Sequence, residues 1–377
     1  MSEFLGINNY QTKSMSAFES IAFLLIFVAP FTLCTITPLE YNSFIQISAI
    51  ICYFIVLLFR PAILSRIMDG PCRNLIAVYI LCVFFRYIVY GAISFHSILM
   101  PIAASIGYYY IKEYKVNTRV FDLYLLALYV YFGISYYSHL PSLIFRGHFD
   151  DGSWFGGSSS NAIPIALINI LYIYYVISYY QGEKNNKKLL FYSLTNFVLV
   201  FIQQSRIGIV ISVMMLLYFY YNYSLSKSKF LRYVPMLLVI CVSIYYVQFY
   251  LADLTEQVGL ISVQAYEEDC RKAAVDYFFN NMGVKEFFWG YPPGTEFFPN
   301  IDYTYNMWLE HWNKYTVIGF VFLVGIFINR FFRRKEYFFP FFFFIPLLIY
   351  GYVEPRYLPN FWDFFIYLML FTKKVQS

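Results

Sequence analysis

The residues best suited to chemistry in this chain are arginines on one side of its apolar segments. All but eight of the 27 lysines and arginines lie at the termini or in alternate connections between these segments, as the positive-inside bias requires of cytoplasmic regions. The other eight are Arg86, Arg146, Arg206, Arg271, Lys272, Lys285, Lys314 and Arg356. Guanidinium groups bind phosphate oxygens through forked, charge-assisted hydrogen bonds. The five arginines therefore predict an anionic ligand, such as a pyrophosphate, on the non-cytoplasmic side.

Two of the five arginines lie within or beside apolar segments. Arg206 follows Ser205 at the tip of a short hairpin, where it could extend to lipid headgroups or bind a ligand. Since this hairpin gives Arg206 almost no polar surroundings, we favour a ligand-binding role for it. Arg86 lies in the outer half of an apolar segment, where an unpaired arginine costs about 2.5–3.5 kcal/mol. We therefore expect Arg86 to face the helix bundle and to pair with a carboxylate or a phosphate.

The other three arginines lie in loops, and each has an alternative that needs no ligand. Arg146 begins the stretch RGHFDDGSWFGG, which ends at Gly157, and it could be an ordinary exposed charge. Arg271 heads an amphipathic segment and could lie on its exposed face, and Arg356 could pair with Glu354. Several guanidinium groups converging at one membrane surface would instead neutralise a diphosphate, and we expect these residues to contribute to such a site.

A general base can also be chosen from the residues on this side. The four histidines, His96, His139, His148 and His311, all lie there. They form no HExxH motif and no metal-ligand spacing, so no metal site is predicted. His311, in YTYNMWLEHWNKYTVIG, is the favoured base, and Glu310 is the second candidate. Neighbouring helical residues point in different directions, so at most one faces a substrate. His311 could instead be an interfacial histidine between tryptophans.

The composition indicates which elements must position these residues. A chain of 377 residues that is 60% hydrophobic and 13% charged, with a mean hydropathy of +0.56, is not an ordinary soluble domain. Its continuous apolar runs predict membrane-spanning helices, since barrel strands would alternate with period two. The net charge of +5 lies beside the spans, so it reports topology and not nucleic-acid binding. The sequence has no glycine-rich nucleotide loop, and no cofactor is expected.

The charge pattern predicts an all-α integral membrane protein with about twelve transmembrane helices. The spans are roughly 17–36, 43–59, 74–92, 94–111, 120–138, 161–180, 189–204, 207–224, 233–251, 313–329, 337–351 and 360–372. Residues 1–377 would form a single polytopic membrane domain with both termini in the cytoplasm. Two non-cytoplasmic loops are long enough to carry chemistry: 139–160, and the large loop 252–312 between spans 9 and 10.

Several segments together resemble the bacterial O-antigen polymerase (Wzy) family, which is related to the O-antigen ligase (WaaL). These segments are SSSNAIPIAL at 158–167, SRIGI at 205–209, FFWGYPPG at 287–294, YNMWLEHWNKYTVIG at 305–319, and the spacing from Arg146 to Gly157. The third is similar to the family's fGyG turn, and the fourth to its HNxxLxxxxxxGxxG entry into the next span. The resemblance covers roughly residues 140–330. It rests on the order and sidedness of the motifs.

The resemblance implies an inner-membrane glycosyltransferase that is inverting and needs no metal. It would transfer a growing glycan from undecaprenyl diphosphate to a lipid-linked repeat unit at the periplasmic face, with membrane lipid and a polysaccharide chain-length regulator as further candidate partners. His311 or Glu310 would be the base, and Arg206 would stabilise the leaving diphosphate. The candidate substrate-binding residues are Arg86, Arg146, Trp154, Gly157, Asn161, Arg271, Trp289, Tyr305, Asn306 and Arg356.

One departure from the family pattern bears on the choice between activities. Where the ligases have histidine before asparagine, this chain has Tyr305 before Asn306. This favours a polymerase, with an O-antigen ligase, which transfers polymer to lipid A-core, as the alternative. A lipid-linked oligosaccharide flippase is a third reading, for which we expect charges deep in several spans and repeat symmetry. The unexplained charges here lie at the outer interface beside one large loop, which favours an enzyme.

Overall fold

The chain is helical apart from one pair of two-residue strands in the part that the structure describes. This computed structural model describes residues 13–36, 39–92, 94–146, 162–183, 185–202, 206–224, 271–297, 304, 306–353 and 360–374, with single positions and short pieces between 230 and 244. The chain divides into two compact units. Unit 1 contains residues 1–10, 53–112 and 254–377, and unit 2 contains residues 11–52 and 113–253. The single domain predicted for 1–377 stays a prediction.

Unit 2 is a bundle of helices around α8. Its elements are β1 (Lys13–Ser14), α1 (Ala17–Phe23), a π-helical segment (Leu24–Val28), α2 (Ala29–Ile36), β2 (Tyr114–Lys115), α7 (Thr118–Arg146), α8 (Ala162–Tyr180), α9 (Asn186–Ile202) and α10 (Arg206–Ser224). The first helix begins in a capping box, in which Ser16 and Glu19 satisfy each other's backbone N–H groups. The strands β1 and β2 pair in parallel. Helix α8 packs on α2, α7, α9 and α10 and is almost wholly buried.

A buried carboxylate ties three helices of unit 2 together. Asp122 on α7 accepts hydrogen bonds from the hydroxyl of Tyr174 on α8 at 2.7 Å and from that of Tyr192 on α9 at 3.0 Å. Its other oxygen lies 2.6 Å from the ammonium group of Lys188. A buried charge is stable only when it is paired and hydrogen-bonded, and both conditions are met here. This cluster fixes the ends of α7, α8 and α9 against one another.

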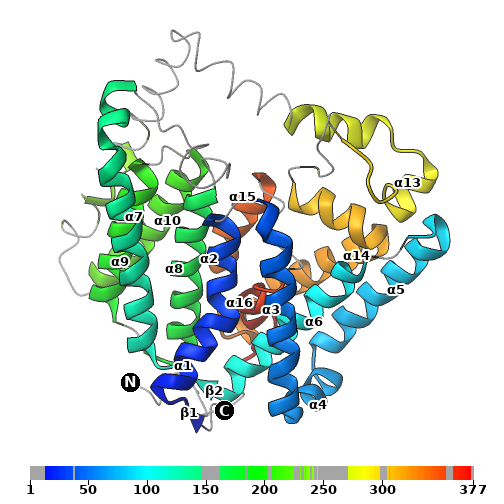
Figure 1. Ribbon diagram of the computed structural model, residues 1–377, viewed down its shortest axis with the longest axis horizontal. Coiled ribbons are helices and arrows are strands. Elements are labelled where there is room, and N and C mark those ends of the chain that lie inside the picture. Colours follow the sequence, from blue (N-terminus) through cyan, green and yellow to red (C-terminus); the bar gives the residue numbers. More distant parts are fainter. Residues whose placement is uncertain are drawn as a thin grey trace. The chain divides into compact units, whose positions relative to one another are not determined.

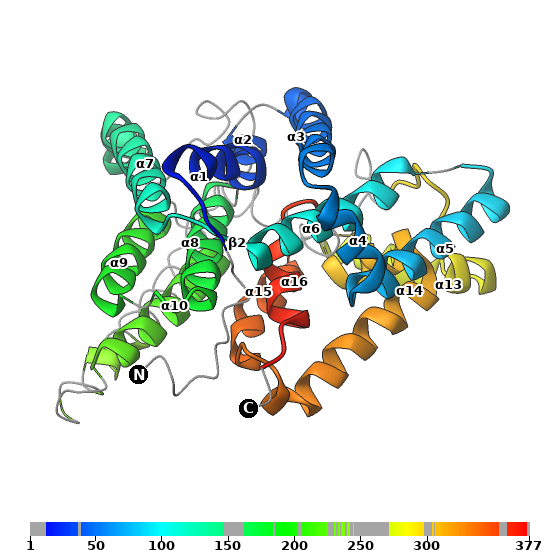
Figure 2. The same cartoon turned by 90° about the horizontal axis from the view of Figure 1, so that it is seen from below.

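Unit 1 carries most of the predicted site residues. Helix α3 (Leu39–Phe59) begins in unit 2 and ends in unit 1. The other elements are α4 (Pro61–Asp69), α5 (Cys72–Tyr90), α6 (Phe95–Glu113), α13 (Val284–Trp289), α14 (Met307–Phe332), two 3-10 turns (Arg334–Glu336 and Phe341–Phe344), α15 (Ile345–Val353) and α16 (Phe364–Phe371). Helices α5 and α14 lie side by side (Figures 1 and 2). Every residue of α16 from Phe364 to Leu370 is buried.

A buried arginine holds the inner end of α14 to α16. Arg330 is fully buried, and its guanidinium group donates hydrogen bonds to the carbonyl oxygens of Met369 and Phe339. Its central carbon also lies 4.1 Å from the ring centroid of Tyr337, within cation–π range. The carbonyl of Met369 belongs to the last turn of α16, where the helix dipole is negative and favours a cation. The charge of Arg330 is therefore stabilised by oriented dipoles.

The number of spans predicted from the sequence is wrong. In the described residues five helices are long and apolar enough to cross a membrane, or six if the bent pair α3–α4 is one span. The other predicted spans contain helices, except 233–251, which lies mostly outside the described residues. Those helices fail for physical reasons: α9 carries lysines and asparagines, and α16 has eight residues. Eight residues rise about 12 Å, against about 30 Å of hydrocarbon.

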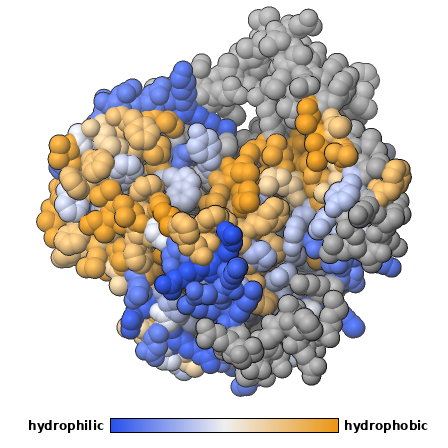
Figure 3. Space-filling model, turned by 180° about the vertical axis from the view of Figure 1, so that it is seen from behind, coloured by the Kyte–Doolittle hydropathy of each residue, from blue (hydrophilic) through white to orange (hydrophobic). Residues whose placement is uncertain are grey.

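The five long helices place the chain among the multi-pass membrane proteins. Large apolar side chains are exposed along α3, α5, α7 and α14, and one view of the surface shows broad apolar areas (Figure 3). In a soluble protein a patch of this kind would be a site of association, whereas in a bilayer it contacts acyl chains. The helical, membrane-spanning part of the predicted fold class is thus confirmed.

Candidate functional site

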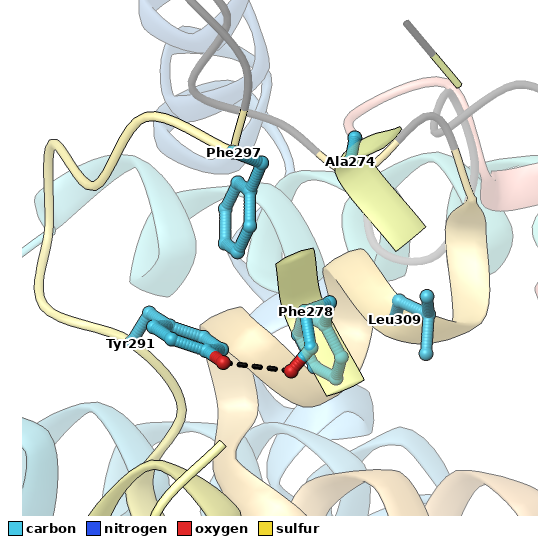
Figure 4. Close-up of a cluster of buried hydrophobic side chains, with 5 residues drawn as sticks. All are labelled: Ala274, Phe278, Tyr291, Phe297 and Leu309. Carbon is cyan, nitrogen blue, oxygen red and sulfur yellow. Dashed lines mark hydrogen bonds between the residues drawn. The ribbon is translucent and has the colours of Figure 1, made fainter. Parts of the chain in front are cut away.

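The large predicted loop folds back on the start of α14. Its described part begins with helical residues 271–280, continues through α13 and ends in a turn that reaches Phe297. A cluster of buried side chains joins these pieces to α14; its members are Ala274, Phe278, Tyr291, Phe297 and Leu309 (Figure 4). The hydroxyl of Tyr291 donates to the carbonyl oxygen of Phe278 at 2.7 Å, and burial raises the pKa of Tyr291 to about 12. This part of the loop is a packed element.

The turn after α13 fits closely against α14, and glycine is required there. Gly290 has a φ of 74°, and a Cβ atom at this position would lie 2.3 Å from the carbonyl oxygen of Asn313. The Asn313 side chain accepts a hydrogen bond from the backbone N–H of Tyr291 at 2.7 Å. From α5, the hydroxyl of Tyr90 donates to the carbonyl of Gly290 at 2.6 Å. The FFWGYPPG segment at 287–294 is therefore bound directly to the segment 305–319.

Arg86 lies at this junction, and its partners are backbone carbonyl groups. The residue is 8% exposed. Its guanidinium group donates to the carbonyl oxygen of Tyr291 at 2.5 Å and to that of Lys314 at 3.2 Å. The sequence correctly predicts that Arg86 faces the helix bundle, but both of these partners differ from the carboxylate or phosphate that we expected. Arg86 thereby joins α5 to the turn and to α14.

Helix α14 is sharply bent at Tyr315 and Thr316. These two residues have non-helical backbone angles, and Thr316 has φ 63° and ψ 171°. This region is nearly exclusive to glycine and costs other residues about 1–3 kcal/mol. The Thr316 hydroxyl accepts from the backbone N–H of Ile318 at 3.2 Å and contacts the sulfur of Cys82 at 3.4 Å. Thr316 thus acts as the N-cap of the inner part of α14, and its hydroxyl fixes the bend against α5.

The bend contains two positions of the segment 305–319 at which the HNxxLxxxxxxGxxG pattern has glycine. When the asparagine of the pattern is aligned with Asn306, its first glycine falls on Thr316 and its second on Gly319. Thr316 has the backbone conformation that glycine adopts most easily. At Gly319, a Cβ atom would lie 2.6 Å from the Cβ of Tyr315. The backbone conformation at Thr316 and the close packing at Gly319 are therefore both ones that glycine accommodates most easily.

His311 lies in the interior of the bend. It is 1% exposed, and its ring packs against the rings of Tyr79 and Tyr315, with centroids 5.2 and 5.0 Å away. Its Nε2 atom is 3.3 Å from the carbonyl oxygen of Gly319. A ring enclosed in this way can take a proton from a substrate only if α14 or its neighbours move. The role of His311 as a base stays a prediction.

Glu310 is also buried, but it is paired with a cation that reaches the surface. Its carboxylate lies 3.0 Å from the ammonium group of Lys314, whose side chain is 44% exposed. The other carboxylate oxygen accepts from the backbone N–H of Thr304 at 3.3 Å. Both carboxylate oxygens of Glu310 are therefore held by polar partners. Of the two proposed bases, His311 and Glu310, Glu310 is the one whose carboxylate contacts a partly exposed side chain, that of Lys314.

Further basic and aromatic side chains surround this end of unit 1. The ammonium group of Lys285 lies 4.5 Å from the ring centroid of Tyr90. Burial, and then the charge of Lys314, lower the pKa of His96 at the start of α6 to about 4, so this ring is neutral at neutral pH. Trp289 is partly exposed and packs at 5.9 Å from the ring of Phe85. This arrangement could hold an anionic group beside an apolar or aromatic surface.

The other predicted site residues divide between described and undescribed positions. Asn306 caps α14 by accepting from the backbone N–H groups of Trp308 and Leu309, and it donates to the carbonyl of Tyr352 at 3.2 Å. Arg271 is partly exposed in the helical residues 271–280. The side chains of Arg146, at the end of α7, and Arg206, at the start of α10, lie outside the described part. Gly157, Asn161, Trp154, Tyr305 and Arg356 also lie outside it.

Sequence reasoning missed four residues of this site: Tyr90, Asn313, Cys82 and Thr316. Asn313 had a usable signal, because an asparagine among aromatic and apolar residues at a membrane entry needs a partner. The other three give no such signal, since each acts through a contact with a residue at least 200 positions away. In the described residues, no group of three or more His, Cys, Asp or Glu could hold a metal ion.

The fold and this site define a helical, multi-pass membrane protein with a folded loop bound to a bent entry helix. The sequence matches no protein-family model and no curated protein, and the structure matches no solved structure.

Proposed function

We propose that this protein is an O-antigen polymerase of the bacterial inner membrane, with its active site at the periplasmic face and both termini in the cytoplasm. The observation that carries the proposal is the direct contact between two motifs of the resemblance. The FFWGYPPG turn and the 305–319 segment are joined by the 2.7 Å hydrogen bond from the backbone of Tyr291 to Asn313. The glycine-like conformation of Thr316 supports the same alignment.

In the proposed reaction a hydroxyl of a lipid-linked repeat unit attacks the anomeric carbon of the growing glycan. The glycosidic C–O bond forms with inversion, and the bond from that carbon to the diphosphate of the donor breaks. The hydroxyl proton passes to a general base, and undecaprenyl diphosphate leaves with both electrons of the broken bond. Neutralising its developing charge with cationic side chains lowers the barrier. No other reactant is needed.

We assign the base to Glu310, because its carboxylate lies 3.0 Å from the ammonium group of Lys314, whose side chain is partly exposed. Lys314 and Lys285 are suited to bind the diphosphate. Arg206, Arg146, Arg271 and Arg356 keep the diphosphate-binding role expected from the sequence. Arg86 is assigned a different one: it holds the turn and α14 together through their carbonyl groups. Trp289 would stack on a sugar ring.

The test is deletion of the gene in the organism that carries it, followed by gel analysis of its lipopolysaccharide. A core that bears one repeat unit, with no ladder above it, is the expected result. Bare core with long polymer on the lipid carrier would identify a ligase, and bare core without polymer would identify a flippase. An unchanged ladder would contradict all three activities.

Complementation then tests the site. Glu310→Gln should fail to restore the ladder, whereas Glu296→Gln, an exposed position on the same loop, should restore it. Amounts of both proteins in the membrane must be equal for the comparison. A full ladder from Glu310→Gln would remove Glu310 as the base.

A further inference from the structure

Helix α4 is turned sharply away from α3. The two helices make an angle of 99° across a break at Arg60. Pro61 explains the break, because proline lacks the N–H that would continue α3 and it restricts the backbone of the residue before it. Proline is well suited to the first turn of the new helix, where that N–H is not needed. If α3 crosses the membrane, α4 runs along its surface.

Helix α4 has three distinct faces. Ile63 and Ile67, four residues apart, are buried against the rest of unit 1. Leu64 and Met68, also four residues apart, are 52% and 59% exposed. Ser65 and Arg66 lie on the remaining side and are exposed. A helix with one face on protein, one apolar face and one polar face fits the boundary between acyl chains and water.

The end of α3, which precedes α4 directly, also exposes large apolar side chains. Ile55, Leu58 and Phe59 are 43%, 80% and 78% exposed in that part of α3. An apolar surface on a membrane-crossing helix contacts acyl chains, so the adjoining Leu64 and Met68 of α4 are placed to do the same. Lipid is therefore the occupant that this surface fits.

A basic side chain of α4 and a basic side chain of α6 lie at the same end of α4. The end of α4 packs against α6, since a Cβ atom on Gly70 would overlap the hydroxyl of Tyr109. Lys112 lies one helical turn beyond Tyr109, and Arg66 lies one turn before Gly70, so the contact between Gly70 and Tyr109 brings the two basic residues to the same place. Arg66 and Lys112 belong to the basic clusters that the positive-inside bias assigns to the cytoplasmic side. Two neighbouring cations at this surface complement a phosphate group.

We propose that α4 lies in the cytoplasmic interface of the membrane, and that Arg66 and Lys112 bind the headgroup phosphate of an anionic phospholipid. The acyl chains of this lipid lie against Leu64 and Met68. This inference is independent of the polymerase proposal, because it concerns the opposite side of the membrane and requires no glycan chemistry.

Lipid binding is the first test. The purified protein is titrated with phosphatidylglycerol or phosphatidylcholine in detergent, and bound lipid is counted by native mass spectrometry. Wild type should retain phosphatidylglycerol preferentially. The double variant Arg66→Gln, Lys112→Gln should bind it about 25-fold more weakly, at about five-fold for each basic residue. The charge-conserving pair Arg66→Lys, Lys112→Arg should retain it.

A matched control removes the same charge elsewhere. Arg333→Gln with Arg334→Gln changes two exposed basic residues of another cytoplasmic connection and should leave the affinity at α4 unchanged. Equal retention of the two lipids by wild type would overturn the headgroup assignment. So would an unchanged affinity in the Arg66→Gln, Lys112→Gln variant.

The position of α4 is tested separately with environment-sensitive fluorophores. The accessible native cysteines are replaced by serine, and Met68→Cys or Ser65→Cys is labelled in vesicles of phosphatidylglycerol and phosphatidylcholine. The label at 68 should be quenched by brominated acyl chains, and the label at 65 by iodide in the water. Quenching of both labels by iodide alone would show that α4 lies in water and would overturn the proposal.

Discussion

The Nε2 atom of His311 lies 3.3 Å from the carbonyl oxygen of Gly319, eight residues later in α14. In a straight helix these residues would be about 12 Å apart along the axis. The contact is possible because the helix bends at Tyr315 and Thr316. The same bend leaves the carbonyl of Lys314 available to Arg86. The outer part of α14 thereby belongs structurally to the folded loop, and the inner part belongs to the membrane-crossing helices.

Substitutions of Thr316 test whether the backbone at the bend of α14 is strained. Replacing it with glycine removes the cost of its positive φ, and glycine is nearly as good as threonine at an N-cap. We expect Thr316→Gly to be as stable as wild type or up to about 2 kcal/mol more stable. Thr316→Val keeps the strain and loses the hydroxyl that accepts from Ile318, so it should lose about 1–2 kcal/mol.

Thermal unfolding in detergent checks this order of stabilities. A Thr316→Gly protein that is less stable than Thr316→Val would show that the hydroxyl contacts outweigh the backbone term. It would also remove the physical reason for aligning Thr316 with the first glycine of the family pattern.

The turn after α13 offers a comparison between two glycines. Gly290 and Gly294 both have positive φ, but only Gly290 would place a Cβ atom against Asn313. Gly294→Ala should cost about 1–2 kcal/mol from backbone strain alone. Gly290→Ala adds a collision with backbone and should cost more than about 3 kcal/mol. Unfolding temperatures and protease sensitivity near residue 290 measure both, and equal losses would contradict this close packing.

Substitutions of Arg86 distinguish a structural role from a role in binding phosphate. Its two hydrogen bonds to carbonyl oxygens are made by a charged donor, and such bonds contribute about 1.5–3 kcal/mol each. We expect Arg86→Met to lose several kcal/mol of stability and to expose the turn at Tyr291 to protease. Arg86→Lys should recover part of the loss. A phosphate ligand would show the opposite pattern, with normal stability in the absence of substrate and loss of activity only.

Much of the fold follows from local features of the sequence. The first predicted span, 17–36, coincides with α1, the π-helical segment and α2, because an apolar run is preceded by the Ser16–Glu19 cap. The span count was too high because apolar composition does not fix helix length. The segment 360–372 is apolar almost throughout, yet Asp363 precedes its helix, which runs for eight residues. Burial inside unit 1, rather than lipid, accounts for its apolar character.

The candidate site was harder to predict, since its contacts join distant residues. The sequence correctly predicts that Arg86 faces the helix bundle, but it does not identify carbonyl groups as its partners. The carbonyl group of Lys314 is available because α14 bends, and neither Tyr315 nor Thr316, where it bends, is a glycine or a proline. The enclosure of His311 depends on Tyr79, more than 200 residues earlier. A histidine beside tryptophans looks the same in the sequence whether it lies in the core or at the interface.

We predict that the stability of unit 2 depends on pH through Glu183, which lies between α8 and α9. Burial alone would raise the pKa of this carboxyl, but hydrogen bonds from Lys115 and Thr118 and the charge of Lys115 lower it below the ordinary 4.5. The stabilisation is therefore complete above about pH 4.5 and is lost as the pH falls through the lowered value. Because the pair is partly exposed, the contribution is less than about 1 kcal/mol.

Thermal unfolding of wild type and Glu183→Gln measures this contribution. Wild type should be the more stable protein at about pH 7, and the difference should shrink as the carboxylate is protonated at about pH 3. In a Lys115→Gln background the same substitution should cost less, since the ion pair is already broken. A difference that is independent of pH would exclude the ionised pair as its source.

The base of the proposed polymerase is tested by separating activity from stability at neighbouring positions. Glu310→Gln should fold normally, because Lys314 is partly exposed and water can solvate its charge. It should reduce glycan transfer by about 10²–10⁴-fold, the usual contribution of a general base. His311→Gln should instead lose stability, because it removes the ring that packs between Tyr79 and Tyr315. Transfer by the folded fraction of this variant should stay within a few-fold of wild type, measured in vesicles with a lipid-linked repeat unit. If His311→Gln is stable but inactive, α14 must open during the reaction, and His311 is the base.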